Sequence, residues 1–281
     1  MSSENIYKED FIYLLSDITI RSLIEEASAH PKFGLVTKLS SGKHRDMDYE
    51  TFAKSIKALR PYINEYAHCG FNFSPNIFND LRVIGVKAED AVLKATGGVN
   101  THKGIIFLLG VLLPSIVDVF YKNKPFEGIQ DNIKILCKDI LDDLKNLDKK
   151  SDLTYGERIY LDYGITGIRG VAKSGIALAF DLEKKYELIN DKNKLVLNIL
   201  LNTMSVLDDT VILHRKNIDT LNYVKEKSKY ILSKGSSNSE EGMDLIKEFT
   251  DECIEMGISP GGSADIVTVV LILMKTRKIL I

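Results

Sequence analysis

Apolar residues recur along much of the chain at steps of three and four residues, which place them on one face of a helix. After Asp48, a residue type that favours helix starts, this spacing runs to Gly70, which is typical of a helix end. The same spacing continues over residues 129–147. Both segments are therefore predicted to be helical.

Start and end signals predict further helices. Thr154 followed by Glu157 has the form of a capping box, and Gly257 followed by Pro260 indicates the end of one helix and the start of the next. We find no series of alternating strands separated by hairpin turns. The chain is predicted to be all-α.

Two stretches, residues 105–117 and 266–274, are apolar on every side of a helix. Such helices belong at the centre of a bundle, where other helices surround them. A chain of 281 residues is long enough to bury a sizeable core. We therefore expect one all-helical domain over residues 1–281, with a single core and functional turns at helix ends.

Composition narrows the range of partners. The 37 basic and 39 acidic residues leave a formal charge of -2, and no basic stripe with interleaved aromatic residues is present, so we expect no nucleic-acid partner. The longest apolar runs are shorter than the roughly 20 residues that cross a bilayer, and the start lacks the form of a signal peptide. Three widely spaced cysteines form no CxxC pair. A soluble cytoplasmic protein without a membrane partner is the expectation.

Polar residues gather in five glycine-containing segments. The first joins "HPKFGLV" (residues 30–36) to "SSGKHRDMD" (residues 40–48). Pro31, Gly34 and Gly42 favour an ordered loop over a helix, although a solvated charged loop is an equally good interpretation. The candidate functional residues of this loop are His30, Lys32, His44, Arg45 and Asp46.

The second segment, "TGGVNTHKG" (residues 96–104), precedes the first strongly apolar run. Asn100 or Thr101 is suited to capping the following helix, and Lys103 stands in its first turn, where a cation opposes the helix dipole. A helix start with glycines and a lysine predicts a phosphate site. A glycine-softened turn with an incidental lysine is the alternative. The candidates are Gly97, Gly98, Asn100, Thr101, His102 and Lys103.

The third and fourth segments are "YGITGIRGVAKSG" (residues 163–175) and "LDDTVILHR" (residues 207–215). The guanidinium of Arg169 is able to bind phosphate oxygens, although close helix packing explains its flanking glycines equally well. Asp208 and Asp209 are candidate Mg²⁺ ligands, because an aspartate together with substrate phosphates commonly holds this ion. The alternative for these aspartates is a helix cap. His214 and Arg215 complete the candidates.

The fifth segment, "GISPGGSADI" (residues 257–266), forms a turn before the last apolar helix and offers free backbone amides and a hydroxyl. Its candidates are Ser259, Gly261, Gly262, Ser263 and Asp265. An acid such as Asp265 also complements the helix dipole without any further role. No GxGxxG after a strand, GxxxxGK[ST], HExxH or GxSxG motif is present.

In order along the chain, "HPKFGLV", "SSGKHRDMD", "TGGVNTHKG", "GITGIRG", "DDTVILHR" and "SPGGSAD" resemble the motifs of the triphosphoribosyl-dephospho-coenzyme A synthases. The resemblance implies an all-helical transferase that joins the triphosphoribosyl group of ATP to the 2'-hydroxyl of 3'-dephospho-CoA and releases adenine. The product is the precursor of the citrate lyase prosthetic group, and a related branch serves malonate decarboxylase. A later transferase step would pass it to the acyl carrier protein.

The chain departs from the family pattern at several positions. Phe33, Val171, Val211, Lys216 and Asn217 stand where a proline, an acid, an asparagine and glycines are expected. The changes over residues 211–217 affect the contacts of that loop.

An oxocarbenium-like transition state requires negative charge near the anomeric carbon, a donor for the departing purine and a base for the incoming hydroxyl. Asp46 or Asp265 is the candidate for the base or stabilising role, and His44 or His102 for protonation of the purine. Lys32, Arg45, Lys103, Arg169 and Arg215 are the candidates for binding phosphates, together with Mg²⁺.

Two other functions fit some of these features. An all-α, Mg²⁺-dependent hydrolase of nucleotides or ADP-ribosyl groups would use water as the acceptor. A helical scaffold would use the glycines for close packing, but leaves the histidine, lysine and arginine residues at helix ends unexplained. A homodimer is compatible with the sequence, which does not fix the oligomeric state.

Overall fold

The computed structural model describes residues 3–145, 147 and 151–280, and in these residues every regular element is helical, as predicted. The α helices are α1 (Ser3–Ser28), α2 (Tyr49–Cys69), α3 (Phe78–Ala95), α4 (Lys103–Tyr121), α5 (Gly128–Leu136), α6 (Tyr155–Tyr163), α7 (Gly167–Lys173), α8 (Ala177–Lys185), α9 (Lys192–Val206), α10 (Thr210–Arg215), α11 (Ile218–Ser233), α12 (Glu240–Glu255) and α13 (Gly261–Leu280). Short 3-10 turns are η1 (Gly70–Asn72), η2 (Pro75–Ile77), η3 (Asp142–Leu144) and η5 (Ser236–Asn238).

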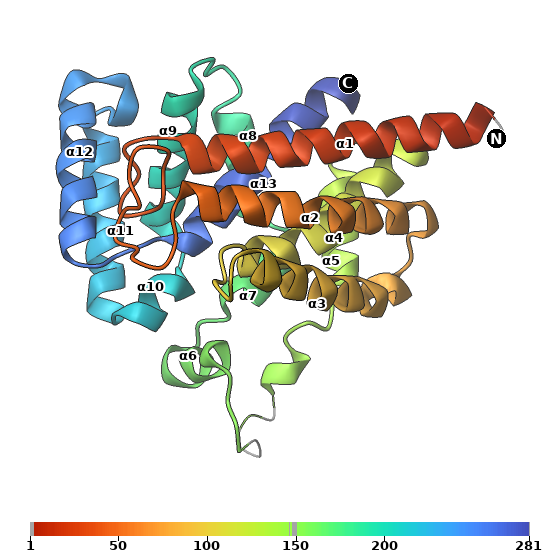
Figure 1. The fold of residues 1–281 in the computed structure, drawn as a ribbon, viewed down its shortest axis with the longest axis horizontal. Coiled ribbons are helices and arrows are strands. Elements are labelled where there is room, and N and C mark those ends of the chain that lie inside the picture. Colours follow the sequence, from red (N-terminus) through yellow and green to blue (C-terminus); the bar gives the residue numbers. More distant parts are fainter. Residues whose placement is uncertain (1–2, 146, 148–150, 281) are drawn as a thin grey trace.

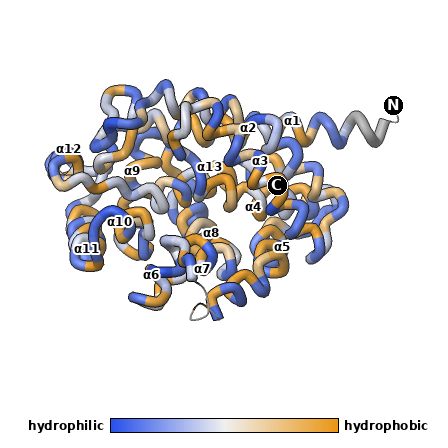
Figure 2. The backbone as a smooth tube through the Cα atoms, turned by 60° about the horizontal axis from the view of Figure 1, so that its bottom comes forward, coloured by the Kyte–Doolittle hydropathy of each residue, from blue (hydrophilic) through white to orange (hydrophobic). Residues whose placement is uncertain are grey.

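Helices α4 and α13 form the centre of the bundle, as their apolar sequences predicted. Helix α13 packs against α1, α4, α8 and α9, and α4 also packs against α2, α3 and α5 (Figure 1). Figure 2, which colours the chain by residue hydropathy, shows hydrophobic residues along both central helices. Helix α4 extends beyond its apolar run, and the whole helix is long and apolar enough to cross a membrane. However, 78% of that stretch is buried inside the protein. It is a core helix of the bundle.

Side-chain caps define several helix ends where the sequence predicted them. Asp48 accepts a hydrogen bond of 2.8 Å from the Thr51 backbone N–H at the start of α2. The Thr154 N–H donates to Glu157 Oε2 at 2.7 Å at the start of α6. Gly257 has a positive φ of 65° between α12 and α13, a conformation that glycine adopts without strain. These predicted boundaries are confirmed.

The helix predicted over residues 129–147 is wrong in its second half. Helix α5 ends at Leu136, and beyond it the chain continues in tighter turns, with N–H to carbonyl bonds from Ile140 to Cys137 and from Leu144 to Leu141. Leu144 and Leu147 are nevertheless buried. A succession of tight turns keeps apolar residues on one side almost as an α helix does, so the spacing alone did not separate the two.

The buried apolar side chains of the described residues form one connected core. The predicted domain, residues 1–281, also includes positions outside the described residues. One end of the bundle carries most of the polar segments. There the end of α1 and the start of α2 are joined by the loop of residues 29–48, which lies beside α12 (Figure 1).

This loop is ordered by packing, as its proline and glycines predicted. Gly34 has a φ of 74°, and a Cβ at that position would come 2.2 Å from the Ile258 carbonyl oxygen. The Phe33 N–H donates to Thr250 Oγ1 of α12 at 3.2 Å, and the Phe33 ring packs against Phe249. Because the loop is fixed to α12 and to the turn before α13, its polar side chains have defined positions.

Candidate active site

An ion pair lies buried where the loop meets the end of α1. The Lys32 ammonium donates hydrogen bonds to the Glu26 carbonyl oxygen at 2.7 Å and to Glu26 Oε1 at 2.8 Å. Only 2% of Lys32 and 6% of Glu26 is exposed, so each charge depends on the other for compensation. Lys32 is therefore committed to Glu26 and has little capacity left for a phosphate.

His102, the residue before α4, is buried next to this pair. Its removal from water, with a smaller contribution from the Lys32 charge, lowers the pKa of His102 to about 3. The imidazole is therefore neutral near pH 7. Its ring also contacts the edge of Phe52, with a distance of 5.0 Å between ring centroids.

Two hydroxyl groups lie within hydrogen-bond distance of His102 Nδ1. The Thr101 hydroxyl donates to Ser55 Oγ at 2.8 Å, and the Ser55 hydroxyl lies within hydrogen-bond distance of His102 Nδ1. Both contacts are made at Nδ1, and in the tautomer in which Nδ1 accepts the Ser55 proton the ring proton is on Nε2. Neither neighbouring hydroxyl occupies Nε2, so this N–H is available as a donor.

Asp265 lies in the first turn of α13, against the start of α4. Its carboxyl group accepts a hydrogen bond from the Ile105 backbone N–H. A Cβ at Gly104 would come 2.0 Å from Asp265 Oδ2, so this approach requires glycine. Burial first, and then the charges of Asp209 and Glu26, raise the pKa of Asp265 well above its ordinary value. The carboxyl group is therefore suited to accepting a proton.

Asp209 joins the starts of α10 and α13. Its Oδ1 accepts from the Val211 N–H at 3.0 Å and the Gly262 N–H at 3.3 Å, while Oδ2 accepts from the N–H and the hydroxyl of Ser263 at 2.8 and 2.9 Å. These four donors use both oxygens, and the residue is 1% exposed. Asp209 thus caps two helices, which was the alternative interpretation from the sequence.

The neighbouring Asp208 is exposed and pairs with the Lys225 ammonium. Among the described residues, no group of three or more histidine, cysteine, aspartate or glutamate side chains is placed to hold a metal ion. The oxygens of Asp209 already accept four hydrogen bonds, so Asp209 does not fit the predicted role of a Mg²⁺ ligand, whereas this role stays a prediction for Asp208. The predicted Mg²⁺ requirement itself stays a prediction.

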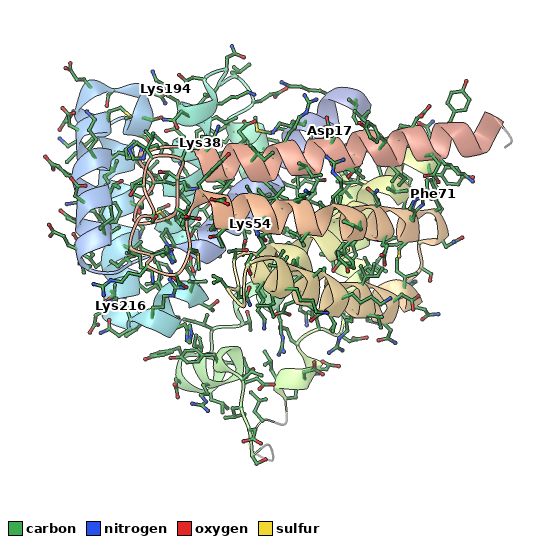
Figure 3. All side chains as sticks on the ribbon, in the orientation of Figure 1. Asp17, Lys38, Lys54, Phe71, Lys194 and Lys216 are labelled. Atoms are coloured by element: carbon green, nitrogen blue, oxygen red, sulfur yellow. The ribbon has the colours of Figure 1, made fainter. Side chains whose placement is uncertain are left out.

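Positive charges without carboxylate partners gather on the other side of the loop. We define the cation cluster as Lys43, Arg215 and Lys216, none of which has a carboxylate within ion-pair distance among the described residues. Burial and then the Arg215 charge lower the pKa of Lys43, the Asp46 charge opposes this change, and Lys216 adds a smaller lowering. Lys216 lies at the turn after α10, on the same side of the molecule as the loop that carries Lys38 (Figure 3). Such a cluster attracts anions.

His44 connects the cation cluster to the turn before α13. Its Nε2 lies 2.9 Å from Ser259 Oγ, and its Nδ1 lies 3.6 Å from Asp46 Oδ1, which is beyond hydrogen-bond distance. Burial, followed by the charges of Lys43 and Arg215, lowers the pKa of His44 to about 4. Asp46 and Arg45 are exposed. Of the two predicted carboxylates, Asp265 lies in the buried cluster and Asp46 at the surface.

The segment of residues 96–104 differs from the predicted phosphate site. Helix α4 starts after His102, so neither Asn100 nor Thr101 occupies the N-cap position, and that expectation is wrong. Lys103 is exposed and pairs with Glu89 at 3.0 Å, and the Asn100 amide donates to the same carboxylate at 3.3 Å. Glu89 from α3 thus compensates the lysine, and Asp265 takes the Ile105 N–H.

The remaining predicted residues are dispersed around this centre. Gly97 and Gly98 have φ values of 69° and 94°, with open space where a Cβ would lie. Arg169, in α7, is partly exposed and has no carboxylate within ion-pair distance among the described residues. The exposed His214 ring contacts the Tyr155 ring. A Cβ at Gly261 would contact Val211 at 3.3 Å, which places one departure from the family pattern beside the α13 turn.

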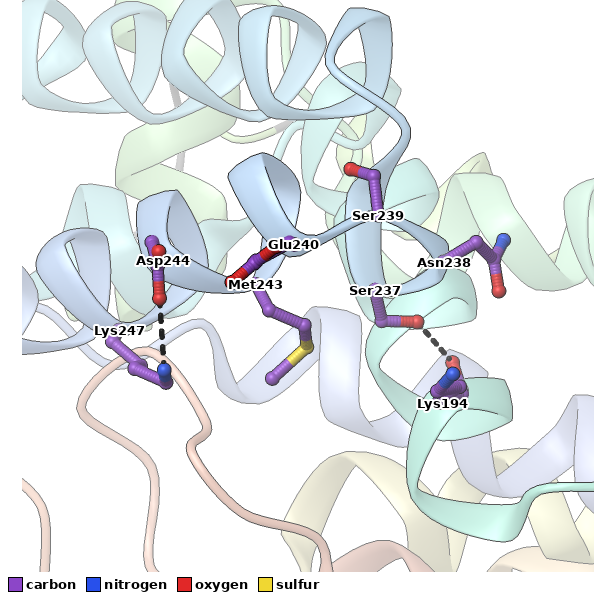
Figure 4. A pocket seen from close by; sticks show the side chains of 8 residues that line it. All are labelled: Lys194, Ser237, Asn238, Ser239, Glu240, Met243, Asp244 and Lys247. Carbon is purple, nitrogen blue, oxygen red and sulfur yellow. Dashed lines mark hydrogen bonds and ion pairs between the residues drawn. The ribbon is translucent and has the colours of Figure 1, made fainter.

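Two pockets flank α12. One, of about 380 Å³, is lined by His30, the loop and α12, and His30 Nδ1 lies 3.2 Å from Thr37 Oγ1 at its edge. The other, of about 350 Å³, lies between the starts of α9 and α12 (Figure 4). Lys247 lines both pockets and pairs with Asp244 at 2.9 Å. Only the first pocket adjoins predicted site residues.

Sequence reasoning missed Glu26, Ser55 and Lys43. Glu26 and Ser55 lie on amphipathic helices, where nothing local distinguishes them from ordinary polar residues. Lys43 stands inside the segment "SSGKHRDMD", directly before His44, and that position was the available signal.

Comparison with known proteins gives consistent matches over nearly the whole chain. Residues 13–280 match the family model CitG, described as ATP:dephospho-CoA triphosphoribosyl transferase. A probable 2-(5''-triphosphoribosyl)-3'-dephosphocoenzyme-A synthase from Streptococcus equi subsp. zooepidemicus is 34% identical, over 92% of this chain and 94% of the relative. Proteins of the same name from Vibrio cholerae and Salmonella gallinarum are each 33% identical, over 90% and 91% of this chain and 85% and 88% of theirs. No solved structure matches.

Proposed function

The chain belongs to the ATP:dephospho-CoA triphosphoribosyl transferase family, and we propose that the polar cluster at its helix ends is the centre where this transfer takes place. The enzyme is a transferase that moves the triphosphoribosyl group of ATP to 3'-dephospho-CoA and forms the precursor of the citrate lyase prosthetic group. The bond that breaks joins ribose to adenine, and the bond that forms joins the same ribose carbon to the 2'-hydroxyl of the acceptor.

One observation carries the assignment of the site. The charge of Lys32 acts on the neutral His102, and the charge of Glu26, the partner of Lys32 in the buried ion pair, acts on Asp265, whose pKa is raised. Glycosyl transfer needs a donor for the leaving base and a carboxylate near the anomeric carbon. The cluster holds both groups, at the starts of the two central helices.

His102 is the proposed hydrogen-bond donor to the departing adenine. Its pKa of about 3 means that the ring is neutral, so it acts through its Nε2–H and not as a charged acid. A hydrogen bond from this N–H to a ring nitrogen of adenine stabilises the negative charge that develops there as the bond breaks. Ser55 and Thr101 both contact Nδ1, which leaves Nε2 to the purine.

Asp265 is the proposed base for the incoming hydroxyl. Its neighbours Asp209 and Glu26 favour the protonated form, so taking the proton of the acceptor relieves repulsion between carboxylates. Direct attack by the hydroxyl inverts the anomeric centre, and we favour this course because only one acceptor has to enter. His44 then has a supporting role, in which it orients the Ser259 hydroxyl.

The cation cluster is the proposed phosphate site. Among the described residues, Lys43, Arg215 and Lys216 have no competing carboxylate at ion-pair distance, and the exposed Arg45 and partly exposed Arg169 are further candidates for binding phosphates. We expect Mg²⁺ to accompany ATP, held mainly by phosphate oxygens and water. Asp208 stays the candidate protein ligand, since both oxygens of Asp209 are occupied by hydrogen bonds. We further propose a cytoplasmic location and a later transferase that passes the product to the acyl carrier protein.

The test is chromatography of the purified protein after incubation with ATP, Mg²⁺ and 3'-dephospho-CoA. Free adenine and a heavier coenzyme product, formed only when both substrates are present, are the expected result. Adenine released without the acceptor, or ADP in place of adenine, would instead support a nucleotide hydrolase.

A further inference from the structure

Aliphatic and hydroxyl-bearing side chains line the pocket between the loop and α12. Pro31, Leu35 and Ile254 supply aliphatic surface, and Thr37, Ser40 and Thr250 supply hydroxyl groups within a cavity of about 380 Å³. Cavities of this size, with mostly apolar walls and a few polar groups, are typical of small-molecule sites. Neither the proposed transfer centre nor the proposed phosphate site places a ligand in this pocket.

The charges around the pocket argue against a phosphate as its occupant. Lys247 pairs with Asp244 at 2.9 Å and is accompanied by Asp251. The ammonium of Lys32, the other cation that lines the pocket, is bound to Glu26. No phenylalanine or tyrosine is among the described residues that line it, which leaves the His30 ring as the aromatic side chain there. A neutral chain with few polar atoms fits best.

The pocket and the cation cluster are adjacent in the chain, where Gly42 meets Lys43. Gly42 lines the pocket, and Lys43 follows it directly in the chain. A ligand that spans both places therefore has an anionic part beside Lys43 and a neutral, partly apolar part beyond Gly42. In 3'-dephospho-CoA the diphosphate is followed by the pantetheine arm, an aliphatic chain with two amides, a hydroxyl and a thiol.

We propose that this pocket binds the pantetheine arm of the acceptor and so selects 3'-dephospho-CoA over shorter adenine nucleotides. The proposal rests on the proposed function, which supplies the acceptor. Ser40 is the polar contact with capacity to spare: its Oγ accepts from the Gly42 N–H at 3.0 Å, and its own proton is free for an amide carbonyl of the arm. Thr37 and Thr250 already hold the loop in place.

The test uses Ile254, which is partly exposed in α12 and lies outside the buried cluster. Ile254→Trp fills the pocket, and Glu248→Trp places the same side chain on α12 away from it. Calorimetry measures the dissociation constants of 3'-dephospho-CoA and of ADP, which has the same nucleotide diphosphate without pantetheine. We expect wild type to bind 3'-dephospho-CoA about tenfold or more tightly than ADP, since tenfold corresponds to only about 1.4 kcal/mol.

In Ile254→Trp this preference should disappear because binding of 3'-dephospho-CoA falls to the level of ADP, whereas Glu248→Trp should keep the wild-type preference. An unchanged preference in Ile254→Trp, or equal binding of the two ligands by wild type, would overturn the proposal. The binding comparison does not depend on turnover. Failure of adenine release would therefore count against the proposed function alone.

Discussion

Gly104 offers the sharpest test of the contact between the starts of α4 and α13. In Gly104→Ala the new Cβ would lie 2.0 Å from Asp265 Oδ2, whereas ordinary contacts begin at 3.4 Å. The carboxyl group must therefore retreat by about 1.4 Å, provided that the backbones stay in place. Displacement of a catalytic group by about 1 Å lowers a rate by about 100-fold, and we expect kcat to fall by at least that factor.

Stability should change much less than activity. Overpacking costs about 1–3 kcal/mol, and alanine recovers about 1 kcal/mol over glycine within a helix, so the net loss is about 0–2 kcal/mol. Urea unfolding measures this loss, and adenine release under saturating substrates measures kcat.

The matched control is Gly110→Ala in the same helix. Its Cβ would lie 3.0 Å from Tyr66 Cε1, away from the cluster, so it should lower stability without lowering kcat. If Gly104→Ala retained the kcat of Gly110→Ala, Asp265 would not be the group whose position limits the reaction.

Three further predictions concern charge. Lys43→Ala and Lys216→Ala should each raise the KM for ATP, with the largest effect at low ionic strength, and steady-state kinetics at two salt concentrations checks this. Lys32→Met should cost about 3–5 kcal/mol in urea unfolding because it leaves Glu26 buried and unpaired, and adding Glu26→Gln should recover much of it. Burial lowers the pKa of His102 from 6.5 to about 3, so the unfolded state binds the extra proton between these values. Stability should therefore fall as pH drops through that window, and less so in His102→Asn.

The helix boundaries were predicted correctly where a capping side chain or a glycine of positive φ marks them. Asp48, Thr154 and Gly257 marked helix boundaries correctly because caps and positive φ angles depend on only a few neighbouring residues. The apolar sequences of α4 and α13 predicted their central positions because a helix that is apolar on every side is stable only when other helices surround it. The end of α5 was missed because tight turns preserve the apolar spacing.

The sequence indicated the segments that carry the candidate residues but not the pairs that these residues form. Lys103 pairs with Glu89 of another helix, a contact that the sequence did not indicate, and its predicted phosphate contact stays a prediction. Asp209 resembled a metal ligand because nothing in the sequence indicated that Gly262 and Ser263 would turn their N–H groups toward it. Contacts between distant segments decide both outcomes, and single-sequence patterns carry no information on them.

The cap shared by α10 and α13 also fixes a length. Asp209 holds the first residues of both helices, and Arg215 is the last residue of α10. The six residues of α10, about 9 Å in length, therefore separate Arg215 from the turn that carries Asp265. If Arg215 binds the triphosphate, as proposed, helix α10 separates the anchored triphosphate tail from the sugar carbon that reacts. Inserting one residue in it would turn Arg215 by about 100° and lengthen that spacing by about 1.5 Å, so the span of the donor is built into the helix.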